Sequence, residues 1–469
     1  MENSDPNDRK RKSDTVFLYF VLCTANVLQF EYGCCLVWTS PVIPQLQSPD
    51  PEVNPLGERI TTFQISLLAG IPPLVMILAP ILFGKLPDVI GRKNTMIGIS
   101  SVFLLANTAL SFGSHIYVYY AGRSVIGLCM GLLMIVLPIY LNEICEDHNR
   151  AKHGCLMMFF IPLGSLYGFL VGAVTTVEVF TLLSTMPLIP QLIVFCLVLP
   201  ESPYYTASKG EKQTTISILE RLRSNKSSEE IEEDYNHIET TLKSLSKSEK
   251  GTWKDILRSK ASRKGFIIGL GSCLSTQMSG IPVIMSYMGL IFNNARTNMS
   301  GNAVSILVGS VKLFFYFVTM NIVERLGRRP LLIFSSAGCG ISLGILAVYL
   351  YLNDVDSPII DNIRWLPVVS ILVYISSLSL GLGSIPTAIL SEFFSDDLRS
   401  VTTSSALIIV NFCIFILTTA FPILSELWGV HYCIGIFSIS CFFSFIFLFL
   451  MFPETRGKSF LEIQEILMK

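Results

Sequence analysis

Two ionisable side chains interrupt long apolar stretches of the sequence. Lys312 lies within residues 301–324, and Glu31 lies within residues 15–38. An ionised side chain at the centre of a bilayer costs about 2.5–3.5 kcal/mol unless it faces a polar cavity or has a partner. Facing a cavity, Lys312 could donate hydrogen bonds to a hydroxyl group or bind an anion. Two other interpretations stay open: Lys312 lies near a helix end and extends to the interface, or it pairs with Glu31.

Other kinds of chemistry have no signal in the sequence. Most of the 12 cysteines lie inside apolar runs, and none forms a Cys-x-x-Cys or Cys/His cluster of the kind that binds zinc. The sequence contains no Walker motif for ATP, and a net charge of -1 gives no electrostatic attraction to nucleic acid. We therefore expect no catalytic residue, metal, cofactor, ATP site or nucleic-acid partner, and the chain is predicted not to be an enzyme.

The composition predicts a membrane protein. The 469 residues are 51% hydrophobic and 15% charged, with a mean hydropathy of +0.57, whereas soluble proteins carry about 25% charged residues. A helix needs about 20 apolar residues to cross a bilayer, and backbone groups in lipid must bond within the helix. Twelve such stretches are present, at residues 15–38, 60–84, 93–113, 115–141, 153–174, 177–199, 264–292, 301–324, 330–352, 365–390, 402–424 and 430–452.

Three charged motifs occur twice along the chain, in the same order. In the first motif, an acidic residue is followed three residues later by glycine and then by two basic residues. In the second, a glutamate is followed seven residues later by arginine. The third is Pro-Glu-Ser or Pro-Glu-Thr, directly after the sixth or the twelfth apolar stretch. The copies are Asp88 to Lys93 and Glu324 to Arg329, Glu143 with Arg150 and Glu392 with Arg399, and 200–202 and 453–455. Internal repeats are typical of secondary transporters. We predict an all-α membrane protein with twelve transmembrane helices in two pseudo-symmetric six-helix bundles.

Positive charge in the short loops predicts the orientation in the membrane. Bases gather before the first stretch and in the repeated turns, so both termini and the central loop are expected in the cytoplasm. The predicted parts are tails at 1–14 and 453–469, bundles at 15–199 and 264–452, and a linker at 200–263. Asn298 lies in a glycosylation sequon on the outer side.

The linker mixes charged residues with leucine and isoleucine at helical spacing. Glu229-Glu230-Ile231-Glu232-Glu233-Asp234 is an example. This pattern predicts short amphipathic helices on the membrane surface. A partly disordered linker is the alternative.

Nearly the whole chain resembles the sugar porter family of the major facilitator superfamily. The residues that carry the resemblance are Gly84-Lys85-Leu86-x-Asp88-x-x-Gly91-Arg92-Lys93, Gly122-Arg123, Pro138-x-Tyr140-x-x-Glu143 with Arg150, Pro200-Glu201-Ser202-Pro203, Gln277-x-Ser279-Gly280, Glu324-Arg325-x-Gly327-Arg328-Arg329-Pro330, Glu392 with Arg399, and Pro453-Glu454-Thr455-Arg456-Gly457-Lys458-Ser459. The stretch from Trp38 to Leu46 resembles the insect facilitated trehalose transporter branch. The resemblance implies a carrier of a small neutral sugar, acting as a monomer in the plasma membrane by alternating access.

The resemblance assigns the cytoplasmic charges to a gate. They are expected to pair between the bundles when the site opens outward and to separate when it opens inward. Exposed ion pairs contribute only about 0–1 kcal/mol each, so several together would set the balance between the two states. The expected gate residues are Asp88, Arg92, Glu143, Arg150, Glu324, Arg328, Arg329, Glu392 and Arg399. These charges could instead only fix the topology and anchor the helix ends.

The expected sugar site departs from the family pattern. A neutral sugar needs amide and hydroxyl partners near the midplane, and the family supplies them from several helices. Here the family's helix 5 Gln is Met158 and its helix 10 Trp is Thr387, whereas Gln277 is kept. The expected substrate-binding residues are Gln277, Thr276, Tyr287, Lys312, Thr387 and Asn411. Interruptions at Gly280-Ile281-Pro282 and between Gly381 and Pro386 are expected to break two helices near this site.

Two alternatives to a facilitative carrier remain. Proton-coupled members of the family carry an Asp at the position of Gly33, near the arginine that matches Arg123. Glu31 could replace this Asp, although two residues turn a helix by roughly 200°. The loss of several of the family's polar residues from the site also suggests a sugar sensor that does not transport. The short tails argue against a sensor, and the substrate could also be a small anion drawn to Lys312.

Overall fold

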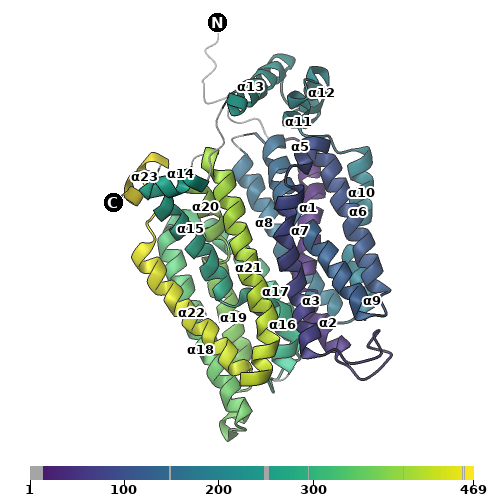
Figure 1. Cartoon of the computed structure of the whole chain (residues 1–469), viewed down its shortest axis with the longest axis vertical. Coiled ribbons are helices and arrows are strands. Elements are labelled where there is room, and N and C mark those ends of the chain that lie inside the picture. The colour runs from purple at the N-terminus through teal and green to yellow at the C-terminus, as the bar shows by residue number, and fades with distance from the viewer. Residues whose placement is uncertain are drawn as a thin grey trace.

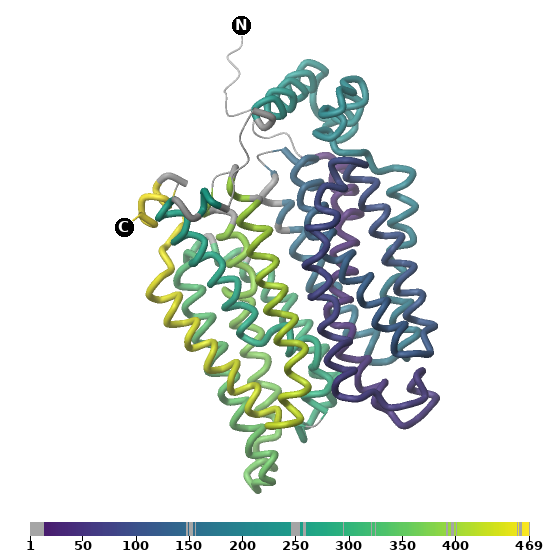
Figure 2. The backbone as a smooth tube through the Cα atoms, in the orientation of Figure 1, coloured from purple at the N-terminus to yellow at the C-terminus, as the bar shows by residue number. Residues whose placement is uncertain are grey.

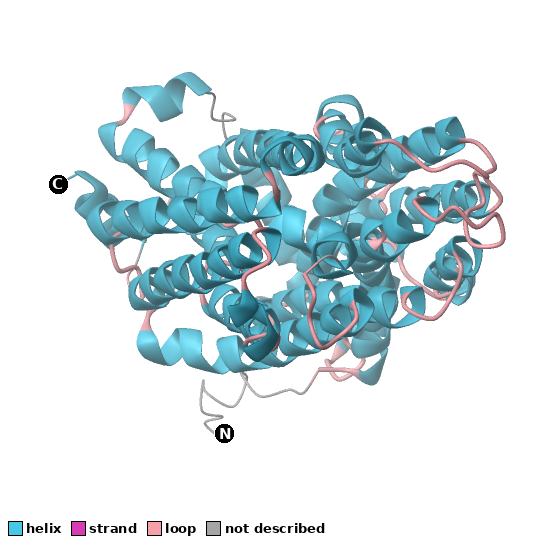
Figure 3. Ribbon diagram, turned by 90° about the horizontal axis from the view of Figure 1, so that it is seen from below, coloured by secondary structure: helices cyan, strands magenta, loops and turns pink. Residues whose placement is uncertain are grey.

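The computed structural model describes residues 14–146, 149–247, 253–293, 295–394, 396–456, 458 and 460–468, and the regular structure in these ranges is helical. Eleven helical segments of the described residues are long and apolar enough to cross a membrane, and a shorter apolar helix covers Leu156–Gly172. Each of the twelve predicted stretches overlaps one of these segments. The helices run along a common axis, as the views from the side and from one end show (Figures 1 and 3).

The first six stretches form α1 to α10, and the last six form α15 to α22. The first set is α1 (Val16–Val37), α2 (Thr39–Leu46), α3 (Thr62–Met76), α4 (Leu78–Phe83), α5 (Leu86–Ile90), α6 (Arg92–Ser111), α7 (Ile116–Ile144), α8 (Arg150–Gly172), α9 (Val177–Thr185) and α10 (Leu188–Leu197). The second set is α15 (Lys260–Met278), α16 (Ile281–Asn293), α17 (Gly301–Leu326), α18 (Arg328–Asp354), the 3-10 helix η2 (Pro358–Asn362), α19 (Leu366–Leu380), α20 (Ile385–Glu392), α21 (Asp396–Trp428) and α22 (Val430–Met451).

The two sets pack mainly within themselves. In the first half α1 packs on α8, and α6 and α3 pack on α7; in the second half α18 packs on α22 and α19. The halves lie side by side (Figure 2) and meet along α3 with α21, α8 with α17, and α2 with α16. This is the predicted arrangement of two helical bundles around a shared seam.

Glycines allow close helix packing inside the first half. A Cβ atom on Gly33 of α1 would lie 2.2 Å from the carbonyl oxygen of Ile161, and one on Gly164 of α8 would lie 1.9 Å from that of Phe30. Small residues at such contacts bring helix backbones together, which is a main source of stability where lipid removes the hydrophobic driving force. The α1–α8 contact therefore depends on both glycines.

The predicted helix interruptions occur in both places. α15 ends at Met278 and α16 begins at Ile281, with Gly280 at φ 85°. α19 ends at Leu380 and α20 begins at Ile385. Three further breaks were not predicted: they separate α1 from α2 at Trp38, α3 from α4 at Ile77, and α9 from α10 near Pro187.

The linker forms helices α11 (Pro203–Ser208), α12 (Lys212–Leu222), α13 (Ser228–Lys247) and α14 (Trp253–Arg258), and α23 (Phe460–Met468) follows the last span. The predicted short amphipathic helices are present, and their placement on the membrane surface stays a prediction. Leu219 of α12 packs against Ile231, Tyr235 and Ile238 of α13 in a small core of their own. The apolar faces of α12 and α13 thus cover each other.

Salt bridges fasten this linker to the first half. Lys226 contacts Glu146, which follows α7, at 3.0 Å and Asp234 of α13 at 2.9 Å. Arg223 also pairs with Asp234, at 2.5 Å. Thr15, at the start of α1, donates to the carbonyl of Leu222 at 2.7 Å. We call the end of the bundle where α11–α14 and α23 lie the linker end, and the opposite end the far end (Figure 1).

Candidate functional site

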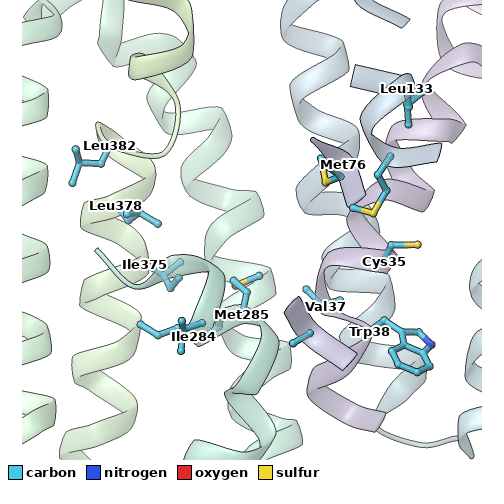
Figure 4. Packing of buried hydrophobic residues seen from close by; sticks show 14 of the residues in the cluster. Cys35, Val37, Trp38, Met76, Leu133, Ile284, Met285, Ile375, Leu378 and Leu382 are labelled. Atoms are coloured by element: carbon cyan, nitrogen blue, oxygen red, sulfur yellow. The ribbon is translucent and has the colours of Figure 1, made fainter. Parts of the chain in front are cut away.

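A cavity of about 230 Å³ lies between the two halves. Residues of α1, α3 and α7 line one side, and residues of α15, α16, α17 and α21 line the other. In the close view, Met76 of the first half and Met285 of the second half lie on opposite sides of the space between the bundles (Figure 4). A hollow of about 410 Å³ between α18, α19 and α22 is lined almost wholly by apolar side chains such as Ile341 and Phe442, so it offers little to a polar ligand.

Three of the predicted substrate-binding residues line the cavity: Gln277, Lys312 and Asn411. Asn411 donates from Nδ2 to the carbonyl of Leu407 at 2.9 Å, which leaves its amide oxygen to accept from a ligand. Lys312 is the twelfth residue of α17, in the middle of this helix. The interpretation of Lys312 as a residue near a helix end is therefore wrong.

The other three predicted residues do not line the cavity. Thr276 donates to the carbonyl of Leu382 at 2.6 Å and so ties α15 to the break after α19. Tyr287 is fully buried, donates to the carbonyl of Thr418 at 2.8 Å and stacks on Phe421. Thr387 is exposed on α20. Thr276 and Tyr287 thus hold the cavity walls in place, because each bonds to a backbone carbonyl elsewhere in the second half.

Glu31 points away from the cavity, into the first half. It is 1% exposed, accepts from Asn107 Nδ2 of α6 at 3.0 Å, and lies 3.6 Å from the Cys35 thiol. Its second carboxylate oxygen has no hydrogen-bond partner among the described residues. The hypothesis that Glu31 pairs with Lys312 fails, since its partners lie on α1 and α6 while Lys312 faces the cavity.

Arg123 of α7 is buried and lines the cavity. Its Nε donates to the carbonyl of Leu68 and its Nη1 to that of Cys35, both at 3.3 Å. The guanidinium also lies over the Trp38 ring, 5.1 Å from the ring centroid, a favourable cation–π position. Carbonyl dipoles and an aromatic face therefore hold this cation in place.

At the linker end, Arg92 pairs with residues of its own half. Its Nε and Nη2 bond both carboxylate oxygens of Glu143 at 2.9 and 3.0 Å, and Nη2 lies 3.1 Å from Asp88. Ser202 also donates to Glu143. Such a two-pronged contact is stronger and more directional than a single ion pair. In this conformation the contact braces the first half, and pairing of Arg92 across the halves stays a prediction for a different conformation.

Two glutamates that the sequence motifs contained but did not explain cap helices. Glu201 accepts from the backbone N–H groups of Arg92 and Lys93 at 2.9 and 3.0 Å, at the start of α6. Glu454 accepts from those of Arg328 and Arg329 at 3.1 and 3.0 Å, at the start of α18. A carboxylate at a helix N-terminus satisfies free N–H groups and the helix dipole. The repeated Pro-Glu motif marked both glutamates as paired features, although it did not indicate their partners.

A positive backbone angle makes room for each cap. Gly91 has φ 98° and Gly327 has φ 86°, a region that favours glycine. A Cβ on Gly91 would also lie 2.2 Å from Glu201 Oε2, and one on Gly327 2.8 Å from Glu454 Oε2. The glycines of the two charged turns thus let a carboxylate reach the following helix.

Part of the predicted gate cannot be placed. Arg150, Glu324 and Glu392 lie on α8, α17 and α20, but their side chains lie outside what the structure describes. Arg399 is exposed on α21. The gating role of this group therefore stays a prediction.

The far end joins the halves tightly. Thr39 Oγ1 donates to the carbonyl of Ser286 at 3.0 Å, and Gly289 N–H donates to Ser40 Oγ at 3.1 Å. A Cβ on Gly70 of α3 would lie 2.0 Å from Thr419 Oγ1 of α21. These contacts close the cavity toward the far end.

The family of the chain follows from a match over most of its length. The model of the family described as "Sugar (and other) transporter" matches residues 20–467. The chain belongs to this sugar transporter family. This transporter is 28% identical over 439 residues to the facilitated trehalose transporter Tret1 of Polypedilum vanderplanki, covering 93% of this chain and 85% of the relative. It is 27% identical over 471 residues to a Tret1-2 homolog of Drosophila sechellia, covering 99% and 94%.

Solved structures show the same fold for the transporter. The inward-open xylose transporter XylE from E. coli superposes with a TM-score of 0.78 at 18% identity, covering 96% of this chain and 99% of that chain. A D-xylose–proton symporter gives 0.73 at 17% identity, covering 94% and 100%. The fold is thus that of the major facilitator superfamily, and the family makes the chain a transporter, not an enzyme.

The Glu454 cap of the transporter gives a first prediction. Partial burial opposes ionisation of Glu454, but four backbone N–H donors outweigh it and hold its pKa below the ordinary value of 4.5. A lowered pKa stabilises the fold above the unfolded-state value, and this contribution is lost as the pH falls through the folded-state pKa. Glu454→Gln is expected to lower the free energy of unfolding by about 1 kcal/mol at neutral pH.

The difference between wild type and Glu454→Gln should shrink as the pH falls below about 4.5, the ordinary value. Unfolding midpoints of the purified protein across pH measure it. Glu465→Gln, at an exposed carboxylate of α23, is the control and should behave as wild type. An equal loss for Glu454→Gln at every pH would contradict the charge-based cap.

Proposed function

We propose that this transporter moves a sugar, such as trehalose or a hexose, down its gradient by alternating access. The observation that carries the proposal is the cavity between the halves, lined from both sides and closed by direct contacts at the far end. The named activity of the relatives as facilitated trehalose transporters supports the substrate class. The cavity of about 230 Å³ lies just below the range of about 300–1,000 Å³ that holds drug-sized ligands, which favours a small ligand.

We further assign Gln277, Asn411 and Lys312 to sugar binding and place the linker end in the cytoplasm of a cell whose plasma membrane the chain spans. The bases of the charged turns and the linker lie at this end, which supports the orientation. In this orientation Asn298, exposed between α16 and α17, faces outside and is a candidate for glycosylation. Domain boundaries at 15–199, 200–263 and 264–452 and a functional monomer complete the proposal.

A proton-coupled symporter is the second candidate, and one observation favours it. Glu31 is a buried carboxylate with one oxygen that lacks a hydrogen-bond partner among the described residues. Ionisable residues inside transmembrane helices are commonly functional. Against it, the partners of Glu31 are Asn107 and Cys35, and those of Arg123 are the carbonyls of Leu68 and Cys35.

Uptake of labelled glucose and trehalose into proteoliposomes tests these functions. A facilitative carrier is expected to show saturable uptake that stops at equal concentrations and does not respond to a pH gradient. Sugar accumulation that is driven by an inward proton gradient and is lost in Glu31→Gln would contradict the facilitative carrier and support the proton-coupled symporter. Absence of saturable uptake by folded, correctly inserted protein would contradict transport and leave a sugar sensor, which still binds sugar.

A further inference from the structure

Two cationic side chains line the central cavity from opposite halves. Lys312 comes from α17 and Arg123 from α7, and the neutral polar side chains Gln277, Asn411 and Ser286 line the same space. Among the described residues that line the cavity, none is aspartate or glutamate. The cavity walls therefore contribute positive charge with no acidic side chain among them to balance it.

The nearest candidate for a counter-charge is directed elsewhere. Glu31 lies on the same helix as the lining residues Tyr32 and Cys35, but it is 1% exposed and bonds to Asn107 on the side of α6. Arg123 has neutral partners, two carbonyls and the Trp38 ring. Lys312 has no hydrogen bond or ion pair with another described residue. Neither cation is thus neutralised by a described carboxylate.

This arrangement is unfavourable for an empty or purely neutral site. Charges at membrane depth are usually paired or belong to a ligand pathway. A neutral polyol accepts hydrogen bonds from both groups but leaves their charge in place. An anionic group accepts from the three ammonium N–H donors and from the guanidinium, and it forms stronger charge-assisted hydrogen bonds.

We propose that the cavity binds an anionic group, with Lys312 and Arg123 as its cationic partners. The proposal rests on the proposed function, because it refines what the sugar carrier takes. One source of the charge is a carboxylate on the sugar itself, as in a sugar acid. The other is a separate small anion, such as chloride, that binds together with a neutral sugar. The Gln277 and Asn411 amides then serve the sugar hydroxyls in either case.

Equilibrium binding to the purified full chain tests the proposal without requiring transport. The probes are D-glucuronate and D-glucuronamide, which share the sugar ring and differ in charge. Wild type is expected to bind glucuronate about tenfold more tightly than glucuronamide. Lys312→Gln should bring the two affinities close together, and Arg123→Gln should do the same. Lys212→Gln, at an exposed lysine of α12, is the control and should keep the wild-type ratio.

A second arm identifies the source of the anion. Glucose binding is measured with chloride and with chloride replaced by methanesulfonate, a larger anion. If a separate anion binds with neutral sugar, glucose affinity falls about fivefold or more without chloride, and Lys312→Gln removes this dependence. Preference for glucuronate without any chloride effect assigns the charge to the sugar.

The outcomes separate the proposal from the proposed function. Equal affinity for the charged and uncharged probes, together with glucose binding indifferent to chloride, overturns the anionic site even if neutral sugar is transported. Charge-selective binding that depends on Lys312, in a protein without saturable uptake, supports the anionic site and overturns transport. Lys312→Gln decides the test if Arg123→Gln does not fold.

Discussion

Gly289→Val is expected to reduce sugar uptake about tenfold or more. Gly289 of α16 lies against α2 of the other half, where a Cβ atom would be 2.6 Å from the carbonyl oxygen of Ser40 and 3.3 Å from Pro44 Cγ. A backbone oxygen cannot move aside without moving α2. Overpacking of this kind costs about 1–3 kcal/mol, which changes a conformational equilibrium about 5- to 150-fold. The cost falls on the conformation closed at the far end.

Uptake and the unfolding midpoint, measured on the same preparation, check this prediction. Gly98→Val is the matched control, because a Cβ at Gly98 meets nothing within 4 Å. Ser40→Ala removes only the acceptor of the Gly289 N–H and should give a smaller loss in the same direction. Uptake by Gly289→Val equal to that of Gly98→Val would show that closure at the far end does not limit the cycle.

The sequence predicted the helices and the breaks after α15 and α19, because both depend on local chemistry. Long apolar runs must be helical in lipid, and the breaks at Gly280 and Gly381 follow residues that disfavour helix. The break at Trp38 was not predicted because α1 and α2 form one apolar run and the Trp38 backbone stays helical, at φ -52° and ψ -40°.

The sequence predicted a cavity-lining residue correctly only where its position along a helix was enough to place it. Lys312 and Asn411 lie midway along α17 and α21, and both line the cavity. Tyr287 and Thr276 instead bond to the backbone carbonyls of Thr418 on α21 and of Leu382 in the break after α19. Whether a polar side chain faces the cavity or a neighbouring helix depends on how the helix is rotated about its axis. A helix that is apolar on every face gives no sequence pattern from which this rotation can be read.

The caps show a different limit. Glu201 and Arg92 are 109 residues apart along the chain, so a contact between them is set by tertiary structure. The sequence showed that the charged turn and the Pro-Glu motif each occur twice. It gave no reason to expect that the glutamate of the Pro-Glu motif contacts the charged turn. In the structure the duplication repeats this joint as a unit, with Gly327 and Glu454.

The Arg92–Glu143 contact should couple strongly in a double-mutant cycle. The two side chains are 12% and 15% exposed and share two hydrogen bonds. Removing either partner loses hydrogen bonds to a charged group, at about 1.5–3 kcal/mol. The loss of unfolding free energy in the double variant Arg92→Met/Glu143→Gln should be smaller than the sum of the losses in the two single variants. Each single variant leaves one charge of the pair without its partner, whereas the double variant removes both charges. Unfolding midpoints of the four proteins measure the coupling.

The exposed pair of Lys243 and Glu239 on α13 is the matched control. Its ends are 2.9 Å apart with side chains 69% and 44% exposed, so its coupling should stay below about 1 kcal/mol. A coupling at Arg92–Glu143 no larger than the control would contradict a structural brace. Strong coupling would instead mean that the charged turn and the end of α7 move as one body. Contacts between the two halves at the linker end must then form while the Arg92–Glu143 pair stays intact. Otherwise the free energy of this pair is lost in every transport cycle.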